Sequence, residues 1–241
     1  MTTHIVAMGG GGFSMSSDKT VTNLDRYVIN LCDEPHPMVC FVPTASADDP
    51  AYVRRFFDAF APTGVRTSVL TLWENAADSV KQAEEADILY VGGGSTVNLL
   101  ALWQAHGVTD MIKRRIKNGN LVLAGLSAGA SAWFEGCTTD SFGADALRTW
   151  RGGMGLINGS FCPHYDGEAE RAPLFANSIA TGALPDGYGV EDGAAIHAID
   201  GEIHRFIAER PGPKVHRVYG MFTPTTSGVV TEEQRTRQVR L

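Results

Sequence analysis

The stretch LVLAGLSAGASAWF, residues 121–134, decides the fold of this 241-residue chain. Its first five residues are apolar or small, which is typical of a strand buried on both faces, and residues 128–134 have the composition of a helix. Ser127 stands at the junction, inside the pattern G-x-S-x-G. A buried strand that passes through a tight turn directly into a helix is typical of α/β proteins, so we expect that fold class.

Apolar runs alternate with helical patterns on both sides of this stretch. We expect strands at residues 4–8, 38–42, 65–72 and 87–91, and helices at 49–60, 79–85, 96–106 and 108–118. Fully apolar strands separated by helices favour a mostly parallel sheet with helices on both faces.

Beyond residue 136 the pattern loosens. We expect a strand at 156–162, a helix at 168–178 and strands at 187–190 and 194–199. The turn Asp200-Gly201 predicts that residues 202–209 pair back as a late β-hairpin. We interpret residues 1–241 as a single domain whose polar tail, after about residue 223, is poorly ordered.

Composition excludes several classes of function. Lysine and arginine total 20 against 27 acidic residues, a net charge of −7, which disfavours nucleic acid or an anionic membrane as a partner. The four cysteines lack metal-ligand spacing, so they suggest neither a zinc site nor a disulfide framework. We expect no metal and no organic cofactor. The start of the chain has no secretory signal, which favours a cytoplasmic location. The sequence leaves the oligomeric state open, including a homo-oligomer.

The pattern around Ser127 predicts a nucleophile. In a G-x-S-x-G elbow, the strained turn projects the serine hydroxyl off the carboxyl edge of the sheet, and the following helix adds a positive dipole beneath it. The alternative is an ordinary strand–helix turn with a capping serine.

A nucleophilic serine needs a base and an acid. Among seven histidines, His164 is favoured because Pro163 ends a strand-like run and leaves His164 at the sheet edge. For the acid we favour Asp192, which follows the strand at 187–190. Glu191 and Asp140 remain alternatives.

Glycine-rich turns predict where an oxyanion would be held. The backbone N–H of Ala128 is the first expected donor, because it follows the nucleophile. A second is expected from the loop Gly92-Gly93-Gly94, which follows the strand at 87–91. We interpret the run of four glycines at residues 9–12 as close packing near the site.

Three segments in order resemble one family: GGGSTVNLL at 92–100, GLSAGA at 125–130 and Pro163-His164. Together they look like the peptidase E/cyanophycinase family of serine peptidases, and the resemblance covers roughly residues 4 to 210. It implies a fold similar to class I glutamine amidotransferases, with serine in place of their cysteine.

The resemblance also implies roles. It implies Ser127 as nucleophile, His164 as base, and oxyanion donors from Gly93, Gly94 and Ala128. It supports an acid at Asp192, and an aspartate shortly after the elbow, where Asp140 stands, also fits the family.

The expected activity is hydrolysis of short peptides through an acyl-enzyme, by a dipeptidase or another exopeptidase. Arg148, Arg151 and Arg171 are candidates for binding an acidic side chain or a terminal carboxylate, although surface arginines are an equal interpretation. The chain departs from the family's aspartyl dipeptidases around Phe142–Gly153. Two alternatives are an α/β-hydrolase esterase and a non-catalytic binding module.

Overall fold

The strands form two sheets that meet at the candidate site. The computed structural model describes residues 2–143, 147–223 and 226–239. Within these residues the first sheet has eight strands in the order β14-β11-β10-β1-β5-β4-β2-β3. Its strands are β1 (Thr3–Met8), β2 (Met38–Val42), β3 (Arg66–Val69), β4 (Ile88–Val91), β5 (Leu121–Leu126), β10 (Ala194–Ile199), β11 (Glu202–Ala208) and β14 (Arg237–Gln238).

The first sheet is parallel on one side of β1 and mostly antiparallel on the other. From β1 through β5, β4 and β2 to β3, every pairing is parallel. On the other side, β10 runs antiparallel to β1 and to β11, which is the expected late hairpin. The α/β class is therefore confirmed, and the mostly parallel sheet is confirmed only in part.

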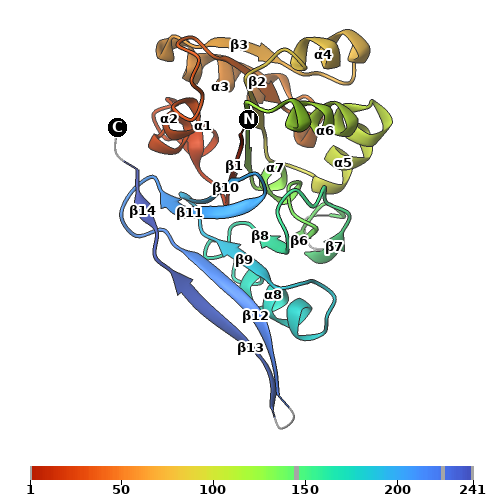
Figure 1. Cartoon of the computed structure of the whole chain (residues 1–241), viewed down its shortest axis with the longest axis vertical. Helices are drawn as coiled ribbons and strands as arrows, with labels where there is room; N and C mark the ends of the chain where they lie inside the picture. Colours follow the sequence, from red (N-terminus) through yellow and green to blue (C-terminus); the bar gives the residue numbers. More distant parts are fainter. Residues whose placement is uncertain (1, 144–146, 224–225, 240–241) are drawn as a thin grey trace.

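Helices cover both faces of this sheet (Figure 1). One layer packs Phe13, Leu24, Phe56 and Phe60 against the sheet, and the other packs Trp103 and neighbouring residues. The first layer comprises α1 (Gly12–Met15), α2 (Asn23–Ile29) and α3 (Pro50–Phe60), and the second α4 (Ala76–Ala83), α5 (Thr96–Ala105), α6 (Val108–Asn118) and α7 (Ala128–Ser131). Two 3₁₀ turns are η1 (Thr44–Ser46) and η2 (Ala61–Thr63).

A second, mixed sheet lies beside the carboxyl edge of the first. Its order within the described residues is β13-β12-β9-β8-β6-β7. The members are β6 (Gly136–Thr139), β7 (Arg148–Arg151), β8 (Ser160–Cys162), β9 (Gly187–Val190), β12 (Val215–Thr223) and β13 (Thr226–Gln234). Helix α8 (Arg171–Ala180) packs on it through Phe175 and Ile179. The sequence did not predict a separate sheet, because its short strands lack long apolar runs.

The expectation of a poorly ordered tail is wrong for most of its length. Residues 226–234 form β13, which pairs antiparallel with β12 from Thr223↔Thr226 to Val215↔Gln234. The two strands form the long hairpin at the bottom of Figure 1. Backbone hydrogen bonds hold this ribbon, so polar side chains such as Glu232 and Glu233 are compatible with it.

Several predicted boundaries shift. Helix α7 ends at Ser131, because the chain turns there, and the strand predicted at 156–162 is confined to Ser160–Cys162. Helix α8 starts at Arg171 rather than at residue 168, which puts Pro173 in its first turn, where a missing N–H costs little. In the described ranges no helix is both long and apolar enough to cross a membrane.

Candidate active site

The turn after β5 holds Ser127 in a strained conformation. Its φ of 51° and ψ of −111° are rare for a residue with a side chain, and strain of this kind concentrates at functional sites. Steric contacts explain why glycine stands at both flanking positions. A Cβ on Gly125 would overlap the carbonyl of Gly129, and one on Gly129 would lie 2.5 Å from the carbonyl oxygen of Val91. The elbow therefore depends on close contact between β4, β5 and α7.

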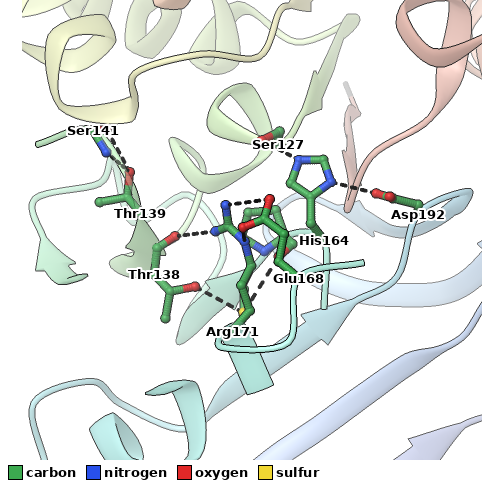
Figure 2. Close-up of polar contacts among 10 residues, drawn as sticks. Ser127, Thr138, Thr139, Ser141, His164, Glu168, Arg171 and Asp192 are labelled. Atoms are coloured by element: carbon green, nitrogen blue, oxygen red, sulfur yellow. Dashed lines mark hydrogen bonds and ion pairs between the residues drawn. The ribbon is translucent and has the colours of Figure 1, made fainter. Parts of the chain in front are cut away.

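His164 reaches Ser127 from the second sheet. Its Nε2 lies 2.9 Å from Ser127 Oγ (Figure 2). The residue follows β8 and Pro163, and its own φ is 50°. The backbone N–H of His164 donates to the carbonyl of Gly9 at 3.2 Å. The backbone N–H of Tyr165 donates to the carbonyl of Val190 at 3.2 Å. The turn that carries the imidazole is thus tied to both sheets.

Asp192 completes the hydrogen-bond chain. Its Oδ1 lies 2.6 Å from His164 Nδ1. Because an ionised carboxylate can only accept, the imidazole must carry its proton on Nδ1, which leaves Nε2 free to accept from the Ser127 hydroxyl. The Asp192 backbone N–H donates to Asp166 Oδ1 at 3.2 Å, which fixes the loop after β9.

The glycine run after β1 packs directly against this pair. Gly10 forms a parallel bridge with Asp192, and its carbonyl accepts from the N–H of Gly193 at 3.0 Å. A Cβ on Gly10 would overlap Asp192 Oδ1 and lie 2.7 Å from His164 Cε1. The structure therefore brings Gly9 and Gly10 next to the site, whereas Gly12 faces Tyr90 and Asp25.

The other two candidate acids lie elsewhere. Glu191 Oε1 contacts His216 Nε2 at 2.8 Å, and its Oε2 accepts from the backbone N–H of Lys214 at 2.9 Å. Asp140 is exposed just after β6. Among the described residues, the carboxylate that contacts the His164 ring is Asp192.

The expected oxyanion donors surround Ser127. Ala128 is buried at the first position of α7. A Cβ on Gly93 would lie 3.5 Å from the Ser127 Cβ, so this backbone is next to Ser127. The Gly93 N–H points to the hydroxyl of Tyr52 at a long 3.5 Å. Gly94 adopts a φ of 134°, which an L side chain rarely does, and a Cβ on it would overlap the carbonyl of Ala45.

Tyr52 is the residue at this site that sequence reasoning missed. Its ring contacts Phe13 and Phe41, and burial raises the pKa of its phenol. In the sequence it reads only as a helix residue of α3. Its place beside Gly93 depends on how α3 packs on the sheet.

The three candidate arginines have different environments. Arg171 is 3% exposed, and its guanidinium donates to Glu168 at 2.7 and 3.2 Å and to the Thr138 carbonyl at 3.4 Å. Figure 2 shows this pair below His164. Arg148 and Arg151 lie exposed on β7, at the end of the segment Phe142–Gly153, of which residues 144–146 are outside the described structure. Arg148 stacks on Phe142 with 5.5 Å to the ring centre.

Cys162 does not compete as a nucleophile. Burial raises the pKa of its thiol to about 12, and the sulfur accepts from the Thr138 hydroxyl at 3.0 Å. A thiol that stays protonated is a poor nucleophile. In the described part of the chain there is no cluster of three or more histidine, cysteine or acidic side chains able to hold a metal ion.

Comparison with known proteins places the chain in a family. The sequence model of the family described as peptidase family S51 matches residues 5–206 of this chain. The chain belongs to peptidase family S51. This membership confirms the resemblance to peptidase E and cyanophycinase, and it makes the protein a member of a family of peptide-bond hydrolases.

Individual relatives agree with this assignment. The uncharacterized peptidase YgaJ of Bacillus subtilis is 43% identical over 217 residues, which are 89% of this chain and 91% of that protein. Peptidase E of Salmonella typhimurium is 29% identical over 150 residues, 61% of this chain and 57% of that one. A peptidase from an acI-B1 actinobacterium has the same fold, with a TM-score of 0.61, 15% identity and coverage of 97% and 96%.

Proposed function

We propose that this S51 peptidase is a serine peptidase that hydrolyses short peptides through an acyl-enzyme formed on Ser127. The observation that carries the proposal is the continuous hydrogen-bond chain from Ser127 through His164 to Asp192. Nucleophile, base and orienting acid stand at the spacing that this mechanism requires.

In the first step, His164 Nε2 takes the proton of the Ser127 hydroxyl as Oγ attacks the scissile carbonyl carbon. Asp192 keeps the other ring proton on Nδ1 and stabilises the imidazolium that forms. The imidazolium then gives its proton to the leaving amine, and the C–N bond breaks. Water, deprotonated by the same nitrogen, then attacks the ester carbonyl carbon. The bond from that carbon to Ser127 Oγ breaks, Oγ takes the proton back from His164, and the second product leaves as a carboxylic acid.

The negative charge on the tetrahedral oxygen needs preorganised donors. We assign these to the backbone N–H groups of Ala128 and of the Gly93–Gly94 loop, which border Ser127. The N–H of Gly93 would exchange its long hydrogen bond to Tyr52 for one to the oxyanion.

Family membership supports short peptides as substrates, and three arginines are candidates for binding a carboxylate of such a peptide. Arg148 and Arg151 are exposed on β7 and could meet a carboxylate of a short peptide, although Arg148 stacks on Phe142 and Arg151 lies 4.0 Å from the Glu135 carboxylate. Arg171 is already paired with Glu168, so it could bind an acidic side chain of the substrate only after that ion pair separates.

The order of the acid and the histidine along the chain argues against the alternative that the protein is an α/β-hydrolase esterase. In α/β-hydrolases the acid precedes the histidine, whereas Asp192 follows His164 here. No described contact favours the second rival, a non-catalytic binding module.

Replacement of the nucleophile tests the proposal. Ser127→Ala should abolish hydrolysis of a dipeptide and tripeptide library while the circular dichroism spectrum and the melting temperature stay close to those of the wild type. Near wild-type peptidase activity in the variant would refute the assignment, and turnover of short-chain esters without turnover of any peptide would favour the esterase.

A further inference from the structure

A cavity of about 380 Å³ opens beside the loop that contains Gly94. It lies between η1 and the first turns of α5, at the carboxyl edge of the parallel strands. Its walls include Ala45, Ala47, Trp73 and Leu102. We call it the Trp73 cavity.

The cavity wall is continuous with the loop next to the nucleophile. A Cβ on Gly94 would overlap the Ala45 carbonyl, so the loop rests directly on the cavity wall. The N–H of Ser95 donates to the same carbonyl at 2.8 Å. Since Gly93 borders Ser127, only Gly93 and Gly94 separate the nucleophile from Ala45.

The lining favours an apolar occupant. Trp73 is 59% exposed, although its ring is large and apolar. Alanines and Leu102 form the remaining apolar surface, and no residue that lines this cavity in the described structure is charged. The volume is within the range of small-molecule sites. A branched or aromatic side chain would cover both Trp73 and the alanines.

The walls are held in place by an unusual loop. Ala47 and Asp48 have φ values of 57° and 54°, although neither is glycine. Asp48 Oδ2 accepts from the N–H of Leu72 at 2.7 Å, which ties this loop to the segment that carries Trp73. The cavity is therefore formed before any ligand binds.

We propose that the Trp73 cavity is a subsite for an apolar side chain of the peptide substrate, at a position beyond the two residues that flank the scissile bond. Trp73 packs on that side chain. A dipeptide has no residue beyond the two that flank its scissile bond, so occupation of this subsite requires at least a tripeptide. This inference rests on the proposed peptidase function.

A leucine scan tests the subsite. Leucine replaces glycine at each position of a tetrapeptide in turn, and kcat/KM is measured for the wild type, Trp73→Ala and Phe57→Ala. Phe57 is an exposed aromatic residue of α3 that does not line the cavity. At one position away from the scissile bond, leucine should raise kcat/KM of the wild type about tenfold or more over glycine.

Trp73→Ala should abolish this leucine-to-glycine preference, and Phe57→Ala should keep it. A preference that survives in Trp73→Ala, or that never appears in a wild type that hydrolyses the peptides, would overturn the subsite.

Binding separates this inference from the proposed function. The affinity of the leucine and glycine tetrapeptides is measured by calorimetry for Ser127→Ala and for Ser127→Ala with Trp73→Ala. The first protein should prefer the leucine peptide about tenfold, and the second should not. If the wild type hydrolyses no peptide but this preference is present, the peptidase mechanism fails and the subsite stands. Equal affinities in the first protein would refute the subsite.

Discussion

At the scale of single residues, the identity of the acid depends on one contact. Asp192 and Glu191 are neighbours in the chain, but successive residues of an extended segment point in opposite directions. Asp192 meets His164, and Glu191 meets His216 on β12. The sequence favoured Asp192 and left Glu191 as an alternative, because which of the two carboxylates meets His164 depends on the face of the loop that turns toward β1.

Asp192→Asn should lower kcat by at least about 100-fold, because an amide cannot hold the imidazole in the required tautomer as a carboxylate does. Glu191→Gln is the matched control and should change kcat little. Steady-state kinetics on one peptide measures both variants. An equal loss in the two variants, or a larger loss in Asp140→Asn, would move the acid to another residue.

At the scale of elements, the end of β1 shapes the site without supplying a reacting group. Gly10→Ala should push Asp192 and His164 apart, since the new Cβ would overlap the carboxylate. We expect kcat to fall by about 100-fold, the range of general acid–base assistance. Gly228→Ala is the control, because a Cβ there meets no atom within 4 Å. An unchanged kcat in Gly10→Ala would contradict this prediction, because it would show that the loop after β1 shifts without displacing Asp192 and His164.

Helix α2 carries a buried carboxyl that makes stability depend on pH. Asp25 accepts from the Tyr90 hydroxyl at 2.6 Å and from the Thr22 N–H at 2.6 Å. Burial nevertheless raises its pKa from 3.8 to about 6. The folded state therefore holds the proton more tightly, so this contribution is complete below pH 3.8 and is lost as pH rises through 6.

Asp25→Asn should remove that dependence, because an amide does not titrate. Between pH 4 and pH 7, the unfolding free energy of the wild type should fall relative to that of the variant by up to about 3 kcal/mol. Urea unfolding at several pH values measures it, with the exposed Asp58→Asn as control. A difference that stays constant with pH would contradict this account of Asp25.

At the scale of the whole molecule, the sequence predicted the first sheet better than the second. Long apolar runs such as residues 87–91 and 121–126 mark strands buried on both faces, and their order fixes the edge at which Ser127 lies. The second sheet consists of short or polar strands, such as Ser160–Cys162 and Thr226–Gln234, whose pairing is tertiary. Tyr52 and the Trp73 cavity escaped prediction for the same reason, since both depend on the packing of distant segments.

The central claim is that Ser127 is a nucleophile activated by His164. Reaction with a fluorophosphonate, followed by intact-mass measurement and peptide mapping, tests it most directly, because the reagent labels activated serines without the need for a known substrate. The account predicts one adduct per chain, located on Ser127, and loss of labelling in His164→Ala. A folded wild-type protein that gains no adduct, or that gains it on another residue, would contradict the account.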